Sequence, residues 1–149
     1  MIAVDTNVLL RRVLDDDVEQ AAKARKLFDG TAPILVTDIV LVEAIWTLKG
    51  KRYRASKDDI VVLVTKLLEE PNVVFESERA IWSALNEFIE APLVKCPDGM
   101  RHADFSDALI VAKAMDAMDR WAVPYDATYT FDVAAQSLHG TKSLDEPAP

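Results

Sequence analysis

The chain has 149 residues, of which 17 are Lys or Arg and 25 are Asp or Glu, giving a formal net charge of −8. This length is most simply one domain, and the acidic balance argues against a nucleic-acid-binding protein with the usual basic surface. No apolar run is as long as a membrane span requires, and the single cysteine, Cys96, excludes an internal disulfide. We therefore expect a cytoplasmic protein that does not enter a membrane.

Short apolar runs rich in β-branched residues alternate along the chain with helical patterns. Strands are predicted at 1–5, 33–37, 72–75 and 127–131, and helices at about 17–30, 37–50, 56–71, 77–92 and 104–120. In 56–71, Ser56 and Asp59 form a capping pair ahead of a clean apolar stripe. This alternation predicts an α/β fold with a mostly parallel sheet between helical layers. We expect a single domain over 1–139 and a disordered tail over 140–149.

Acidic residues follow the first and the last predicted strand. Asp5 ends the first strand, within MIAVDTNVLLR, and Asp132 follows the last one, in TYTFD. Because the carboxyl ends of parallel strands meet at one edge of a sheet, we expect both side chains at that edge. A carboxylate between apolar runs is costly unless a partner compensates its charge.

Three further acids interrupt apolar helical patterns. Glu43 is the only acid within the apolar run 38–48, and its neighbours one turn away include Ile39 and Trp46. Asp104 and Asp107 lie one turn apart on one helix face, and five apolar residues follow Asp107 directly. Carboxylates on hydrophobic elements cannot share a pocket as bare anions, so they either keep protons or bind a divalent metal.

The available ligand types indicate which metal would be bound. Two histidines and one cysteine give no zinc spacing, whereas carboxylates with hydroxyl and amide helpers suit Mg²⁺ or Mn²⁺. The helpers are Thr6, Asn7 and Thr130. A metal held by these acids would attract a phosphodiester, which answers the objection from net charge.

Four segments, MIAVDTNVLLR, the E of VLVEAIW, DFSDALI and TYTFD, resemble in order and separation the acidic motifs of the PIN-domain ribonucleases. The resemblance is strongest to the VapC-type toxins of toxin–antitoxin pairs, and it runs from residue 1 to about 138. It implies a three-layer α/β/α fold with four or five strands in a short central sheet. It also implies Mg²⁺- or Mn²⁺-dependent endoribonuclease activity on RNA, a homodimer, and inhibition by a small cognate antitoxin.

The resemblance assigns roles to individual residues. Asp5, Glu43 and Asp107 match the core catalytic and metal-binding acids, Asp132 matches a more variable fourth acid, and Asp104 matches an additional metal-binding acid. Thr6, Asn7 and Thr130 match the supporting polar residues. The expected chemistry is hydrolysis of an RNA phosphodiester by a metal-activated water, leaving a 5′-phosphate and a 3′-hydroxyl.

Basic residues near these motifs are candidates for binding RNA phosphates. They are Lys49, Lys51, Arg52 and Arg54 of the KGKRYR segment, and Arg101 in the loop before the acidic helix. A solvated turn between helices is the competing interpretation of the first four.

Other interpretations of the acids stay open. Asp5, Asp104 and Asp132 could each be helix N-caps, a common role for Asp. At the level of function, the alternatives are a non-catalytic PIN-like scaffold that binds RNA or protein, and a Mg²⁺-dependent phosphotransfer domain.

Overall fold

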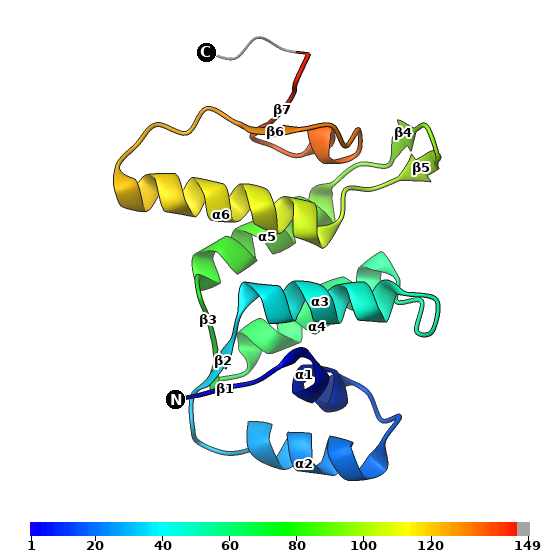
Figure 1. Cartoon of the computed structure of the whole chain (residues 1–149), viewed down its shortest axis with the longest axis vertical. Helices are drawn as coiled ribbons and strands as arrows, with labels where there is room; N and C mark the ends of the chain where they lie inside the picture. Colours follow the sequence, from blue (N-terminus) through cyan, green and yellow to red (C-terminus); the bar gives the residue numbers. More distant parts are fainter. Residues whose placement is uncertain (146–149) are drawn as a thin grey trace. The chain divides into compact units, whose positions relative to one another are not determined.

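The computed structural model describes residues 1–145, which form two compact units, Met1–Glu78 and the residues from Arg79 onward (Figure 1). The first unit contains strands β1 (Ile2–Ala3), β2 (Ile34–Val36) and β3 (Val73–Phe75) and helices α1 (Thr6–Val13), α2 (Val18–Phe28), α3 (Asp38–Lys49) and α4 (Lys57–Glu69). The strands form one parallel sheet in the order β1-β2-β3, with Ile34 in register with Ile2 on one side and Val73 on the other.

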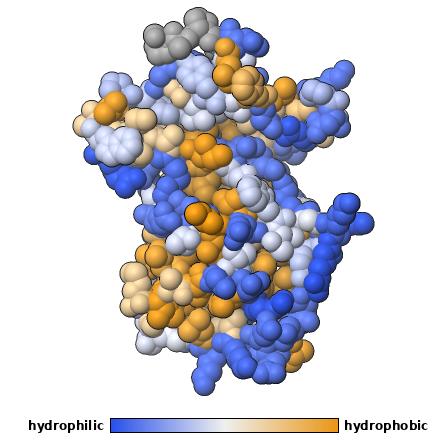
Figure 2. All heavy atoms as spheres, viewed as in Figure 1, coloured by the Kyte–Doolittle hydropathy of each residue, from blue (hydrophilic) through white to orange (hydrophobic). Residues whose placement is uncertain are grey.

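Side-chain caps fix where the helices of the first unit begin. Ser56 accepts from the backbone N–H of Asp59, whose carboxylate accepts from the Ser56 backbone N–H in return, which is the predicted capping box of α4. Ile60 and Val64 then face the core, and Gly50 ends α3 as the sequence predicts. The visible surface of this unit mixes hydrophobic patches with hydrophilic side chains (Figure 2).

The second unit is built around two helices. It contains α5 (Glu78–Glu90, beginning at the boundary), the hairpin of β4 (Val94–Cys96) and β5 (Gly99–Arg101), α6 (Phe105–Trp121), β6 (Thr128–Thr130), the short helix η1 (Ala135–Ser137) and β7 (Thr141–Ser143). Phe88 of α5 and Phe105 of α6 make an edge-to-face ring contact, with centroids 5.9 Å apart. Asp116, the one buried charged side chain among residues 1–145, accepts hydrogen bonds from the Arg79 guanidinium.

The predicted fold class is confirmed: the described residues form a mixed α/β protein with six α-helices and parallel strands, consistent with a PIN-like α/β/α fold. The details differ from the expectation. The parallel sheet has three strands rather than four or five, because β6 pairs in parallel with β7 instead. The prediction of a disordered tail is therefore wrong for residues 141–143, which form β7, while residues 146–149 lie outside the described residues.

Three other elements are absent from the sequence prediction: α1, and the two strands of the β4–β5 hairpin. Helix α1 follows β1 after only two residues, so its apolar residues read as a continuation of the strand. In the hairpin, Cys96 pairs with Gly99 across a two-residue turn, and Gly99 has φ +126°, a conformation that favours glycine. Within residues 1–145, no helix combines the length and apolar character needed to cross a bilayer.

Candidate functional site

Asp5 lies between β1 and α1, at the carboxyl end of its strand, as predicted. It is exposed and is the N-cap of α1, where its Oδ1 accepts a hydrogen bond of 2.8 Å from the backbone N–H of Val8. The prediction that Asp5 could be a helix N-cap is therefore confirmed. The cap uses only one of the two carboxylate oxygens of Asp5. A carboxylate here can cap the helix through one oxygen and ligate a cation through the other.

Glu43 is joined to α1 by a short hydrogen bond. The Thr6 hydroxyl donates to its Oε2 at 2.6 Å, which links the first turn of α1 to the middle of α3. The expectation that Glu43 sits in apolar surroundings is wrong in this structure, because Ile39 and Trp46 on the same helix face are 73% and 57% exposed. Glu43 itself is exposed, so the Thr6 hydroxyl, rather than burial, restricts its carboxylate.

A hollow of about 390 Å³ lies beside Asp5, between α1 and α2. Asn7, predicted as a supporting polar residue, lines this hollow and makes no hydrogen bond to Glu43 among residues 1–145. The basic side chains of Arg11 and Lys23 also line the hollow. The Arg11 side chain is itself held by Asp16 at 2.6 Å and by Gln20 at 2.8 Å. Lys23 is paired in turn with Glu19 at 2.6 Å, so both cations beside the hollow are matched by carboxylates, and Asp5 is the acid that lines it.

In the second unit, Asp104 and Asp107 lie at the start of α6. Asp104 is the N-cap residue, and its backbone N–H donates to Oδ2 of Asp107 at 2.9 Å. Burial raises the pKa of the half-buried Asp107 carboxyl, and the negative charges of Asp104 and Asp132 act in the same direction, while the hydrogen bond from Asp104 opposes them.

Asp132 is held by several hydrogen bonds. Its Oδ2 accepts from Arg101 Nη2 at 2.8 Å, its Oδ1 accepts from the backbone N–H of Ala135 at 2.9 Å, and its own N–H donates to Thr130 Oγ1 at 3.0 Å. The Arg101 guanidinium lowers the pKa of the Asp132 carboxyl and has its own pKa raised in return. Asp132 therefore both assists the start of η1, as the capping alternative proposes, and carries a resident counter-ion.

The structure brings the predicted acids together in two groups, one in each unit. Asp5 and Glu43 belong to the first, and Asp104, Asp107 and Asp132 to the second. Within neither unit do the described residues gather three or more His, Cys, Asp or Glu side chains that could hold a metal ion. That all five acids serve one metal stays a prediction.

The donor chemistry of both groups fits a hard divalent cation. Every predicted ligand is a carboxylate oxygen, and the helpers supply hydroxyl and amide oxygens, the donor set of Mg²⁺ and Mn²⁺. The raised pKa of Asp107 adds a physical reason: its negative charge is disfavoured in the protein alone, and a bound cation would relieve that penalty.

Several predicted RNA-binding residues have partners within their own unit. Arg52 lies 3.3 Å from Asp16 and over the Tyr53 ring, and Arg54 donates to the backbone of Lys51 from a left-handed conformation, φ +53°. Lys51, Arg52 and Arg54 are exposed, whereas Lys49 is the half-buried last residue of α3. Their binding to RNA stays a prediction.

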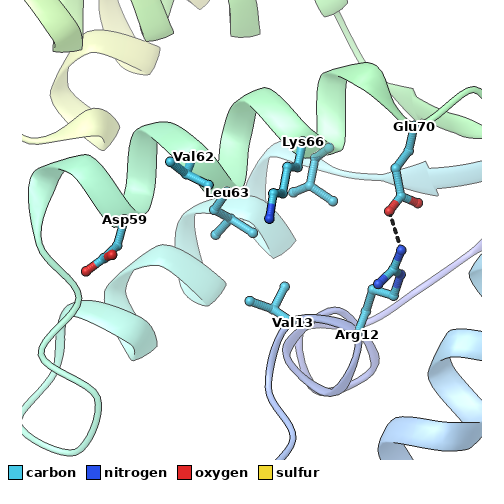
Figure 3. Close-up of a pocket in the computed structure, with 8 residues that line it drawn as sticks. Arg12, Val13, Asp59, Val62, Leu63, Lys66 and Glu70 are labelled. Atoms are coloured by element: carbon cyan, nitrogen blue, oxygen red, sulfur yellow. Dashed lines mark hydrogen bonds and ion pairs between the residues drawn. The ribbon is translucent and has the colours of Figure 1, made fainter.

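One role that sequence reasoning missed is the pairing of Arg101 with Asp132. Thirty-one positions separate them, and the pairing depends on the unpredicted β4–β5 hairpin, so no local sequence signal could have indicated it. A second unpredicted feature is a groove of about 340 Å³ between α1 and α4 (Figure 3). Val13 faces Val62 and Leu63 across it, and the ion pair of Arg12 and Glu70, at 2.6 Å, lies at one end.

Comparison with protein families gives one match, to the family model described as PIN domain, over residues 2–119. The match spans parts of both units and includes Asp5, Glu43, Asp104 and Asp107, whereas Thr130 and Asp132 lie beyond it. A comparison with curated proteins finds no match.

Proposed function

The chain belongs to the PIN-domain family, whose members are in general nucleases, and on that premise we propose that it is an endoribonuclease dependent on Mg²⁺ or Mn²⁺. Its substrate is RNA, and the product ends are a 5′-phosphate and a 3′-hydroxyl. The observation on which the proposal depends is the family match over residues 2–119, because it includes four of the five predicted acids.

Asp5, Glu43 and Asp107 are the proposed principal metal ligands, with Asp104 and Asp132 as additional ones. When bound, the cation lowers the pKa of water and offsets negative charge on the phosphoryl oxygens. The protein's own contribution is to orient the ligands. The Thr6 hydroxyl fixes the Glu43 carboxylate, and the Asp104 backbone N–H fixes Asp107.

Asp132 has a different position in the proposal. Both of its oxygens are engaged, one by Arg101 and one by the start of η1, and it lies outside the family match. To contact the metal it has to share or give up the Arg101 hydrogen bond. We therefore propose Asp132 as an adjustable ligand, because Arg101 sets how much of the Asp132 charge is available to the metal.

We also propose that the protein is the toxin of a VapBC-type pair, a homodimer neutralised by a small cognate antitoxin. The support is the resemblance of the acidic segments to VapC-type toxins. The test is expression in a bacterial host: the wild type arrests growth, an Asp107→Asn variant does not, and a short open reading frame immediately upstream restores growth when co-expressed. Growth that is unaffected by the wild type contradicts the toxin role but leaves the ribonuclease proposal standing.

The ribonuclease proposal is tested with end-labelled single-stranded RNA and the purified protein. Cleavage is expected with Mg²⁺ or Mn²⁺, and none with EDTA, and the products should be substrates for enzymes that require a 5′-phosphate. The Asp107→Asn variant has to lose this activity, since otherwise a contaminant is responsible.

The same experiment covers the scaffold alternative, which has one observation in its favour, the lack of a three-acid metal cluster within either described unit. RNA binding without metal-dependent cleavage would support the scaffold and contradict the enzyme. The family match gives the phosphotransfer alternative no support.

A further inference from the structure

Phe131 is the most exposed large hydrophobic side chain among residues 1–145, at 82% of its surface. It lies between Thr130 and Asp132, so an aromatic ring faces solvent one residue from a proposed metal ligand. An exposed Phe forgoes the stabilisation that burial would give, which the core of the second unit provides for Phe88 and Phe105. Its position therefore calls for a reason other than packing.

The backbone on both sides of Phe131 is fixed. Thr130 Oγ1 accepts from the Asp132 N–H at 3.0 Å, and the Thr130 carbonyl accepts from Gln136 Nε2 at 2.9 Å. The Asp132 carboxylate is bonded in turn to the Ala135 N–H. The ring is thus presented from an ordered turn, so a ligand that contacts it would bear little of the entropic cost of ordering that turn.

A cation lies beside the same turn. Arg101 Nη2 is 2.8 Å from Asp132 Oδ2 and its Nε is 3.5 Å from Asp98 Oδ1, which places the guanidinium next to the segment that carries Phe131. Its charge is shared with these two carboxylates, so the Phe131 ring is the main contact that this turn offers to RNA. Proteins bind single-stranded nucleic acid through two features. Exposed aromatic rings stack on the bases, and cationic groups attract the phosphates.

We propose that Phe131 is a stacking platform for one base of the RNA strand, close to the phosphate that is cut. The inference rests on the proposed ribonuclease function and deepens it, because it assigns a base-binding residue next to a proposed metal ligand. Stacking tolerates every base, so Phe131 contributes affinity and position rather than sequence preference.

The chain offers a matched control. Trp121 is also an exposed aromatic residue of the second unit, at 68%, but it is the last residue of α6, fourteen positions beyond Asp107. At the rise of a helix, roughly 1.5 Å per residue, this places it about 20 Å along α6 from that acid. Trp121→Ala therefore removes an exposed aromatic ring away from the proposed site.

The experiment measures binding of a short fluorescein-labelled single-stranded RNA by anisotropy, with Ca²⁺ in place of Mg²⁺ or Mn²⁺ so that a divalent cation is present, and a gel of each sample verifies that the RNA stays intact. Phe131→Ala should weaken binding roughly five- to a hundredfold, Phe131→Trp should retain it, and Trp121→Ala should leave it unchanged. Phe131→Leu, which keeps apolar volume but has no ring face, should behave like Phe131→Ala. In a series of RNAs with one abasic position each, the effect of Phe131→Ala should disappear at one position of the strand.

The outcomes separate the two proposals. If the wild type binds and cuts RNA, and Phe131→Ala binds it equally well, the stacking inference is wrong and the ribonuclease stands. If Phe131→Leu binds RNA as well as the wild type, the stacking inference is wrong and a general hydrophobic contact explains the binding. If Phe131→Ala leaves RNA binding unchanged but changes the mass of the protein particle measured by light scattering, the stacking inference is also wrong and Phe131 belongs to a protein interface. A wild type that neither binds nor cuts RNA overturns the proposed function itself. Thermal melting of each variant verifies that it folds.

Discussion

The two groups of acids have different partners. In the first unit, Asp5 and Glu43 accept hydrogen bonds from neutral donors, the Val8 backbone N–H and the Thr6 hydroxyl. In the second unit, the acids lie near one another and near a guanidinium, so that Asp107 has a raised pKa and Asp132 a lowered one. Neutral donors orient a carboxylate without neutralising its charge. The Arg101 guanidinium instead neutralises part of the negative charge of Asp132, as a bound metal would also do.

This difference indicates a division of labour. The acids of the first unit are positioned by hydrogen bonds that can persist when a metal binds. Those of the second unit form an electrostatic balance that a cation would change. Substitutions in the first unit should therefore alter geometry, and those in the second should alter charge and its dependence on pH.

The largest expected effect tests whether the two groups act together. Asp107→Asn and Glu43→Gln should each lower kcat/KM for RNA cleavage by about a hundredfold or more, and the double variant should lose little beyond the worse single one, because ligands of one metal act as a unit. Glu90→Gln, an exposed acid at the end of α5, is the matched control. Losses that multiply in the double variant would mean that the two groups do separate jobs.

The next effect concerns orientation in the first unit. Thr6→Val keeps the side-chain shape but removes the hydroxyl that donates to Glu43, and it should lower kcat/KM about tenfold. Thr65→Val, a substitution of the same kind within α4, should have no effect on cleavage. Equal activity of Thr6→Val and wild type would show that Glu43 does not need this donor.

A smaller effect is expected from the resident cation of the second unit. Arg101→Gln removes the positive charge beside Asp132 and should tighten Mn²⁺ binding about fivefold, because the metal no longer competes with the guanidinium for that carboxylate. Titration followed by electron paramagnetic resonance measures the free Mn²⁺ directly, without RNA. Weaker Mn²⁺ binding would instead mean that Arg101 holds Asp132 in a ligating position.

The smallest effect is a pair of opposite pH dependences. A raised carboxyl pKa means that the ionised Asp107 destabilises the folded state at neutral pH. At pH 7, Asp107→Asn should therefore melt at a higher temperature than the wild type. This difference in melting temperature should vanish as the pH falls through the raised pKa toward 3.8. Asp132 has a lowered pKa, so its ionised form stabilises the fold above pH 3.8. Asp132→Asn should therefore melt lower at pH 7, with the difference disappearing below that pH.

Both melting series are measured without divalent metal. The comparison between the units would lose its electrostatic basis if the two variants shifted in the same direction at pH 7. Asp58→Asn, an exposed acid in the first turn of α4, controls for the removal of one negative charge.

Sequence patterns predicted the elements whose signals are local. The capping box of Ser56 and Asp59 and the closing Gly50 involve residues within one turn, so their helices are confirmed close to the predicted bounds. Helix α1 was missed because its eight residues follow a two-residue strand without a turn signal. The hairpin and β7 were missed because each strand is only three residues long and depends on a pairing partner.

The candidate site divides in the same way. Asp5 at the end of its strand and Asp104 at the start of its helix follow from local patterns. The hydrogen bond between Thr6 and Glu43 spans 37 positions, and the Arg101–Asp132 pair spans 31. Such pairings are set by tertiary packing, which the order of residues along the chain does not reveal without a fold.

The pairing of β6 with β7 has a consequence for the segment between them. Residues 131–140 form the crossover of this parallel pair, and the crossover contains both Phe131 and Asp132. Its far end is closed at Gly140, whose carbonyl accepts from the Tyr125 hydroxyl at 2.7 Å and whose φ of +82° suits a residue without a side chain. A proteolytic cut just after Gly140 would separate β7 from the crossover and leave β6 without its strand partner, whereas the hydrogen bonds of Asp132 to Arg101, Ala135 and Thr130 all lie before the cut.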